Sequence, residues 1–189
     1  MTGRTPRTVR VLTSLVLVAG AVALVAGEHI GRQVESSIAR WLLHALTGAT
    51  VLPAGASTVP AVVFQSGDLQ WNVLEITVEC AVAYVLAALV MLGAALALVP
   101  RFGPLRVVLA TAVGAALLVL VNQVRIVLLA LVLAHGGVGP FEWAHSFAGS
   151  VVSLFGLAAT LFVVFLIVIR PGTGRRTSPQ AGPTPGVQA

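Results

Sequence analysis

The chain has 189 residues, of which 58% are hydrophobic and 9% are charged, and its mean hydropathy is +1.01. A soluble globular domain carries about 25% charged residues, so this composition excludes one and indicates an integral membrane protein. The net charge of +5 comes from arginines grouped between apolar stretches, which is typical of membrane topology signals and not of a nucleic-acid surface. The single cysteine excludes an internal disulfide and a zinc site of several thiolates.

Four apolar stretches are long enough to be predicted as membrane-spanning helices. The first also has the basic start and small residues of a cleaved signal peptide, but its apolar run is longer than most signal cores, which favours a retained anchor. In chain order the predicted spans are Val11–Gly27, Ala81–Val99, Val107–Ala134 and Phe147–Ile169. The expected fold is therefore an all-α integral membrane bundle of about four helices.

The arginine clusters predict how these helices are oriented. One cluster lies in residues 1–10, a second is Arg101 and Arg106, and a third lies in residues 170–176. If four helices cross in alternation, all three clusters lie on one side, which the positive-inside rule makes the cytoplasm. We expect a multi-pass protein of the cell membrane with both termini in the cytoplasm. Residues 171–189, rich in Pro, Gly, Ser and Thr, are predicted to form a disordered cytoplasmic tail.

Residues 28–79 are expected on the extracytoplasmic side, between the first and second spans. Their first part predicts an amphipathic helix lying along the membrane surface, because apolar and polar residues alternate at helical spacing. The apolar set is Ile30, Val34, Ile38, Trp41, Leu42 and Ala45, and the polar set is Glu28, Arg32, Glu35, Ser36 and Arg40. Further on, Ala61–Gln65 and Gln70–Glu79 predict the strands of a short β-hairpin around a Ser66-Gly67-Asp68 turn. The alternation of the second strand slips by one residue near Leu74.

Three chemically reactive residues are predicted at one depth, near the outer surface of the membrane. Cys80 and His145 stand at the outer starts of the second and fourth spans, and Arg125 lies nineteen residues after Arg106. That separation is a rise of about 28 Å in a helix, across a hydrocarbon core of roughly 30 Å. Residues 80–170 are therefore predicted to form a three-helix catalytic core. The stripes expected to pack together are Cys80, Ala83, Ala87, Met91 and Ala94; Gly114, Leu118, Val121, Asn122 and Arg125; and His145, Gly149, Ser153, Gly156 and Thr160.

Each of these residues also has a simpler structural interpretation. Cys80 fits a small packing residue, and His145 fits a contact with lipid headgroups. Arg125 fits a packing ion pair, for which Glu79 is a candidate partner, and Asn122 fits a hydrogen bond between helices. A guanidinium inside a span costs about 2.5–3.5 kcal/mol on insertion scales, which favours a functional role for Arg125.

Together these side chains suit acyl transfer through a thioester. Nearby positive charge and a helix N-terminus lower the pKa of a thiol, so that Cys80 becomes a nucleophile. A histidine relays a proton to a leaving amine, and a buried arginine stabilises a thiolate or a developing oxyanion.

Three sequence blocks resemble the signatures of the exosortase/archaeosortase family, whose members are membrane enzymes regarded as cysteine transpeptidases. The blocks are Glu79-Cys80, Asn122-Gln123-Val124-Arg125-Ile126 and His145-Ser146-Phe147-Ala148-Gly149. The resemblance implies Cys80 as nucleophile, Arg125 as its thiolate or oxyanion partner and His145 as general acid/base, with Asn122 and Glu79 in support. Family members commonly carry Ser-Gly after the cysteine, where this chain has Ala81-Val82-Ala83.

The resemblance also implies a substrate: an exported protein whose C-terminal sorting signal has a short motif, one membrane helix and a basic end. The expected function is therefore cleavage of such signals at the extracytoplasmic face, with the lipid bilayer as the other partner and no nucleic acid. No cofactor and no metal are expected. Two alternatives remain, a non-catalytic membrane assembly or export partner of the same fold and a small transporter with Arg125 in its pathway.

Overall fold

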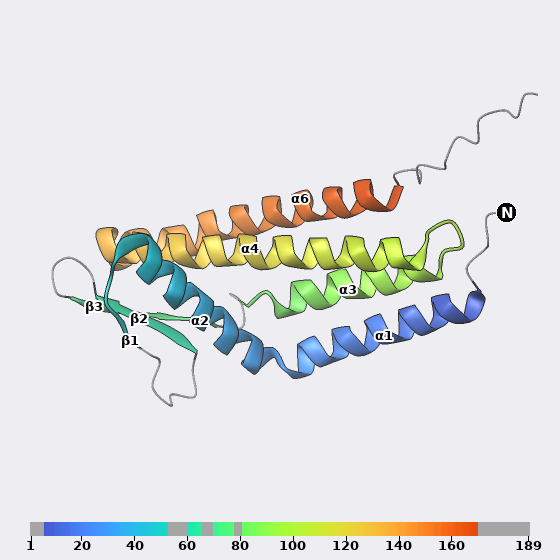
Figure 1. Cartoon of the computed structure of the whole chain (residues 1–189). Helices are drawn as coiled ribbons and strands as arrows, with labels where there is room; N and C mark the ends of the chain where they lie inside the picture. Colours follow the sequence, from blue (N-terminus) through green and yellow to red (C-terminus); the bar gives the residue numbers. More distant parts are fainter. Residues whose placement is uncertain (1–5, 53–59, 66–69, 78–80, 170–189) are drawn as a thin grey trace, which may run out of the picture.

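The computed structural model describes residues 6–52, 60–65, 70–77 and 81–169, and helices make up 81% of them. Long helices form an elongated bundle, and a small sheet lies at one end of it beside an inclined helix (Figure 1). The helices are α1 (Arg7–Ala26), α2 (Glu28–Thr47), α3 (Ala83–Leu98), α4 (Pro104–Gly136), α5 (Val138–Trp143) and α6 (Gly149–Ile169), with a π-helical turn η2 (Ala144–Ala148). The strands are β1 (Val51–Leu52), β2 (Ala61–Gln65) and β3 (Trp71–Glu75).

Three helical segments of the described chain are long and apolar enough to cross a membrane: α1, α4 and the continuous run Val138–Ile169. They indicate association with a membrane. The predicted second span corresponds to α3, which has 16 residues. Its length of about 24 Å is shorter than a typical hydrocarbon core of roughly 30 Å.

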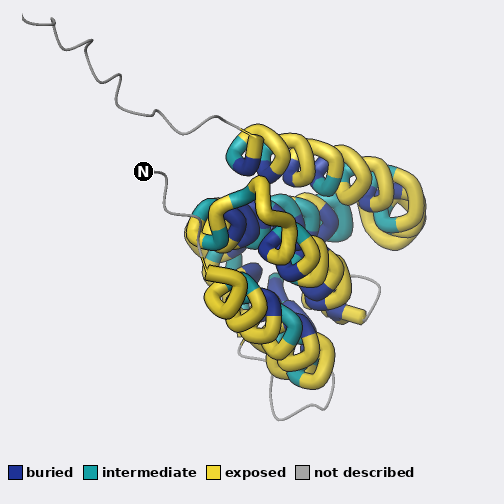
Figure 2. The backbone as a smooth tube through the Cα atoms, turned by 90° about the vertical axis from the view of Figure 1, so that its right-hand side faces the viewer, coloured by how far each residue is buried: buried dark blue, intermediate teal, exposed yellow. Residues whose placement is uncertain are grey.

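Small residues allow the bundle helices to approach closely. α1, α3, α4 and α6 lie side by side in that order (Figure 1). A Cβ on Gly114 of α4 would lie 2.7 Å from Val164 of α6, and Gly156 of α6 packs directly against Val121 of α4. Most of the described residues of the predicted small-residue stripes are buried or half-buried in these contacts, but Met91 of α3 and Ser153 of α6 are exposed. Figure 2 shows buried residues on the inner sides of the helices and exposed ones on the outer sides.

Helix α4 has 33 residues, a length of about 50 Å, and it extends past the bundle. Its C-terminal part packs against α2 and β3. The core of this region consists of Ala39, Leu43, Val62, Phe64, Leu74, Ile76, Ile126 and Ala130. The site described below lies where helix-on-helix packing gives way to this second core.

The predicted amphipathic helix is confirmed as α2. Glu35 was expected on its polar face, but this residue is buried against the protein. The apolar stripe of α2 faces outward, with Trp41 67% exposed, whereas Glu35 is only 5% exposed. Ser36 and Leu43 are buried on the same side as Glu35. The physical reason is that α2 packs on the protein through the side that carries Glu35, where the Val82 backbone N–H and the Asn122 amide donate to the carboxylate.

The predicted hairpin is an antiparallel sheet of three strands in the order β1-β2-β3. β2 has the predicted bounds, β3 is shorter than predicted, and β1 was not predicted. The β2–β3 register is continuous, so the expected slip near Leu74 is wrong: Leu74 faces the core while Trp71 and Val73 are exposed. The predicted turn at 66–68, Glu79, Cys80 and the tail at 171–189 lie outside the described residues.

The connection between the predicted spans Val107–Ala134 and Phe147–Ile169 is almost entirely helical. α4 ends at Gly136, and α5 begins at Val138. Gly137 has φ +73°, a conformation that L side chains rarely adopt, and it permits this tight reversal. Helical structure therefore begins nine residues before the predicted start at Phe147 and continues through η2 into α6.

Candidate active site

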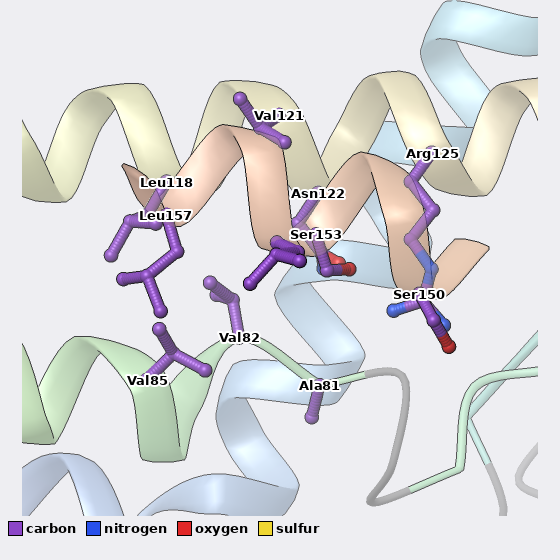
Figure 3. Close-up of a pocket in the computed structure, with 11 residues that line it drawn as sticks. Ala81, Val82, Val85, Leu118, Val121, Asn122, Arg125, Ser150, Ser153 and Leu157 are labelled. Carbon is purple, nitrogen blue, oxygen red and sulfur yellow. The ribbon is translucent and has the colours of Figure 1, made fainter. Parts of the chain in front are cut away.

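Arg125 projects from α4 toward the start of α6, where its guanidinium lies near Ser150 (Figure 3). Its Nε is buried and has no hydrogen-bond partner among the described residues. A Cβ on Gly149 would lie 2.9 Å from this Nε. Because Gly149 has no side chain, it leaves room for the guanidinium of Arg125. The sequence block that contains Arg125 therefore contacts the last residue of the block that begins at His145.

A cavity of about 400 Å³ opens beside Arg125 (Figure 3). Three segments that are distant in the sequence form its walls: the start of α3, the middle of α4 and the N-terminal part of α6. Most of the lining is apolar, with four polar side chains. The lining residues are Ala81, Val82, Val85, Leu118, Val121, Asn122, Arg125, Ser150, Ser153, Leu154 and Leu157. The stripe predicted on the third span thus faces the cavity from Leu118 to Arg125.

A buried carboxylate that the sequence analysis did not select lies next to this cavity. Glu35 of α2 accepts a hydrogen bond from the Val82 backbone N–H to Oε1 (3.2 Å) and one from Asn122 Nδ2 to Oε2 (3.1 Å). Asn122 is 7% exposed, so its amide is committed to Glu35 and not to solvent. The inward spacing of Glu35, Ala39 and Leu43 on α2 was the signal available in the sequence.

Two opposing influences act on the ionisation of Glu35. Burial raises the pKa of its carboxyl above the ordinary value of 4.5, because the charged form is desolvated. The bonds from Val82 and Asn122 and the positive charge of Arg32 oppose this rise in pKa. Arg32 itself lies 2.8 Å from Glu28. Among the described residues, Glu35 is therefore a desolvated carboxyl group with hydrogen bonds from Val82 and Asn122 and a positive neighbour, Arg32, that also pairs with Glu28.

His145 lies in the π-helical turn η2 and is partly buried, with its ring stacked on Phe141 at a centroid distance of 5.7 Å. It is not among the residues that line the cavity. Gly149, four residues later, contacts Arg125, so the turn that carries His145 adjoins the site. A π-helical turn rotates the side chains that follow it relative to an α-helix, which sequence periodicity does not predict.

The remaining predicted site residues, Glu79 and Cys80, lie outside the described residues. The described chain resumes at Ala81 and Val82, and both line the cavity. In the part of the chain that the structure describes, no group of three or more His, Cys, Asp or Glu side chains is arranged to hold a metal ion.

Comparisons of the chain with protein-family models, with curated proteins and with solved structures gave no match. The functional assignment therefore rests on the residues of this chain and their arrangement.

Proposed function

We propose that this protein is a membrane-embedded cysteine transpeptidase or endopeptidase of the exosortase type. It would cleave C-terminal sorting signals of exported proteins at the extracytoplasmic face of the cell membrane. The proposal rests on one observation: Arg125, Ala81 and Val82 line the same cavity. Cys80 directly precedes Ala81 in the sequence. An unpaired guanidinium nitrogen among the described residues at an apolar cavity is suited to stabilise negative charge during a reaction.

The proposed topology has four spans, with α3 as the short second one. α3 is apolar throughout, and a helix shorter than the hydrocarbon core is accommodated by local thinning of the bilayer at modest cost. Arg101 and Arg106 between α3 and α4 then lie in the cytoplasm, and the sheet and α2 lie on the opposite face. This arrangement puts the cavity and the start of α3 toward the outer side, where the sorting signal of an exported protein is accessible.

The reaction begins when the Cys80 thiolate attacks the carbonyl carbon of the scissile peptide bond. A C–S bond forms, and the carbonyl electron pair moves to oxygen, where Arg125 stabilises the negative charge. Collapse of this intermediate breaks the C–N bond, and His145 donates a proton to the leaving amine. An acceptor amine or water then attacks the thioester, passes its proton to His145 and releases the Cys80 thiolate.

The residues that line the cavity indicate which substrate segment it could bind. Leu154, Leu157 and Val85 offer apolar contacts. The hydroxyls of Ser150 and Ser153 donate to carbonyl oxygens one turn earlier on their own helix, at 2.7 and 2.9 Å. A cavity of about 400 Å³ lies within the usual range for ligand sites, and we expect it to hold a short apolar segment next to the scissile bond.

Processing of a tail-bearing exported protein, co-expressed and followed by its loss of mass, tests the proposal. Cys80→Ala and Cys80→Ser should abolish processing, while Arg101→Ala, which changes an exposed arginine outside the cavity, should retain it. Full processing by Cys80→Ala would refute the proposed function.

A non-catalytic assembly or export partner is the second candidate. The same Arg125 would then hold a carboxylate of a client protein, because its Nε has no partner among the described residues. In that case replacement of Arg125 should weaken co-purification of the client while replacement of Cys80 changes nothing.

A further inference from the structure

Strand β3 is an edge strand in the described part of the chain. The strand order is β1-β2-β3, so β3 pairs with β2 on one side and with no described strand on the other. An edge strand leaves half of its backbone N–H and C=O groups without a partner in the sheet, and these groups are able to bond to another extended chain. The free edge of β3 is therefore a candidate binding surface.

Hydrogen bonds of the sheet show which groups of β3 face this edge. The Ile76 N–H donates to the Pro60 carbonyl oxygen at 2.8 Å. In an antiparallel pair, bonded residues alternate with non-bonded ones, so the register makes Leu74 and Asn72 the next bonded residues of β3. The residues between them direct their N–H and C=O groups away from β2. These residues are Trp71, Val73 and Glu75.

The opposite side of β2 gives the same alternation. The Gln65 N–H donates to the Thr50 carbonyl oxygen at 3.0 Å, so Gln65 and Val63 direct their backbone groups toward β1 and leave those of the intervening residue for β3. On β1, the same rule turns the N–H of Val51 away from β2. The backbone N–H groups of Val51 and Val73 thus face outward on the two opposite edges of one sheet.

The outward groups of β3 limit what binds there. Among the described residues, none bonds to the backbone groups of Trp71, Val73 or Glu75. These groups recur at every second residue, about 7 Å apart, as donor and acceptor together. An extended peptide supplies both at this spacing, whereas a helix uses its own groups internally and lipid ester oxygens only accept. The side chains of Trp71 and Val73 are also exposed, Val73 by 56%, and they offer apolar contacts to alternate side chains of an added strand.

The position of β3 connects this edge to the cavity. One end of the strand pairs with Gln65, which lines a pocket with His135 at the end of α4. At the other end, Ile76 belongs to the same buried core as Ile126, which directly follows Arg125. The edge of β3 therefore runs along α4 from its C-terminal end back toward the part that lines the cavity. Its five residues span about 17 Å.

We propose that the free edge of β3 binds the segment of the substrate that precedes its membrane helix, as an added β-strand. The inference rests on the proposed function, which supplies a substrate with a short motif before its membrane helix. Backbone bonds to Trp71, Val73 and Glu75 hold this segment extended, and its apolar side chains at alternate positions lie against Trp71 and Val73. The bound segment extends toward the cavity, so the edge determines which peptide bond lies beside Arg125.

Binding of a peptide to the full-length protein in detergent tests the inference. The probe is a short fluorescent peptide of alternating valine and threonine with a lysine at each end, and fluorescence anisotropy follows its binding. Wild type should bind the probe saturably. Val73→Pro should weaken binding about tenfold or more, because it removes an outward N–H and its ring obstructs an added strand while the bonds to β2 are kept. Val51→Pro is the matched control, since it makes the same change on the opposite edge and should bind the probe as wild type does.

Methylation of the probe distinguishes backbone bonding from apolar contact, and this measurement uses the wild-type protein alone. One probe carries N-methyl groups on the valine amides, and a second carries them on the threonine amides. Only one of these sets faces β3 when the valines lie beside Trp71 and Val73. One methylated probe should therefore bind as the unmethylated peptide does, and the other about tenfold more weakly. Equal binding of the two methylated probes, or no binding of the unmethylated peptide, would overturn the inference.

Processing assays separate this inference from the proposed function. Val73→Pro should raise the KM for a tail-bearing substrate about tenfold, whereas Cys80→Ala should abolish processing and still bind the probe. Processing that persists in Cys80→Ala would remove the function and leave the peptide-binding edge in place. Loss of processing in Cys80→Ala, with wild-type probe binding and KM in Val73→Pro, would keep the function and overturn the role of the edge. Dimers of wild type that Val73→Pro abolishes, together with no binding of the probe, would assign the edge to a second copy of the chain and also overturn the inference.

Discussion

The two halves of α4 pack in opposite ways. Toward its start, Gly114 and the fully buried Ala110 and Val107 meet neighbouring helices through small apolar surfaces. Farther along, within a single turn, Asn122 bonds to a buried carboxylate and the guanidinium of Arg125 lies in a space kept open by Gly149. The first half has the composition that membrane helices need for close packing. The second half carries Asn122 and Arg125, polar side chains that close packing of helices does not require. This difference favours the second half as the position of the functional site.

The consequence is that equivalent changes in the two regions should have different effects. A substitution at Gly114 changes the close contact between α4 and α6, so we expect it to lower the free energy of unfolding. A substitution around Arg125 changes a cavity whose walls are already loosely packed, so we expect it to lower the rate of processing with little change in stability. The following experiments are arranged by the size of the expected effect.

The largest effect is expected from Arg125→Ala. Removing a preorganised donor to an oxyanion lowers kcat by roughly 10²–10³-fold, or about 3–4 kcal/mol. Arg125→Lys should recover little, because a compact ammonium cannot reproduce the planar guanidinium. Processing kinetics with an exported tail-bearing substrate provide the measurement. Wild-type kcat in Arg125→Ala would show that the guanidinium has no part in the chemistry.

A pair of glycine substitutions, one on α6 and one on α4, compares the two regions. In Gly149→Ala the new methyl would meet Arg125 Nε at 2.9 Å, and in Gly114→Ala it would meet Val164 at 2.7 Å and Leu89 at 3.0 Å. The flexible Arg125 side chain can move, so Gly149→Ala should reduce kcat by about tenfold or more while its thermal unfolding stays close to that of wild type.

The expectation for Gly114→Ala is the reverse. Overpacking against Val164 should destabilise the bundle by about 1–3 kcal/mol, and kcat per folded molecule should remain near wild type. Thermal unfolding in detergent and processing rate are measured for both variants. If both variants lose stability and kcat to the same extent, the proposed difference between the two regions is wrong.

Glu35 should make the free energy of unfolding depend on pH, and the direction of this dependence can be predicted. Burial raises the pKa of this carboxyl above 4.5, so the folded protein binds more protons than the unfolded chain between pH 4.5 and the raised value. The free energy of unfolding should therefore decrease as the pH rises through that window and then level off. Thermal unfolding at stepped pH should show this decrease in wild type and a flatter profile in Glu35→Gln. Stability that rises with pH across the window in wild type, but not in the variant, would contradict the assignment.

The smallest effect is expected at Gln123, next to Asn122 in the same sequence block. This side chain is 3% exposed, and both of its amide atoms lack hydrogen-bond partners among the described residues. It lines an apolar groove with Ile38 and Leu42, and it does not line the cavity. Gln123→Leu should raise the free energy of unfolding by about 1 kcal/mol without changing kcat, since it removes an unsatisfied buried amide. A lower melting temperature would mean that the amide has a partner.

Local sequence patterns predicted the parts of the fold that depend on helical periodicity. They placed α1, α2, α3, α4 and α6 and the face of α4 that lines the cavity, because these depend on spacing within one segment. The β2 strand was likewise predicted with its observed bounds.

The remaining features depend on contacts between segments. Glu35 was assigned to a polar face because a helix at an interface was considered against lipid and water alone, whereas the protein provides it with Val82 and Asn122. The π-helical turn at His145 has no periodic signal, and β1 is too short to give one. The apparent slip at Leu74 came from treating exposed apolar residues such as Val73 as core residues.

The most direct test of the proposed chemistry is to trap the thioester. Purified full-length protein, mixed with a tail-bearing substrate and quenched in acid, can be digested and examined by mass spectrometry. The account predicts that the upstream substrate fragment is attached to the peptide containing Cys80, is released by hydroxylamine and is absent in Cys80→Ser. Cleavage of the substrate at the wild-type rate by Cys80→Ser, with no adduct on Cys80 in wild type, would contradict it.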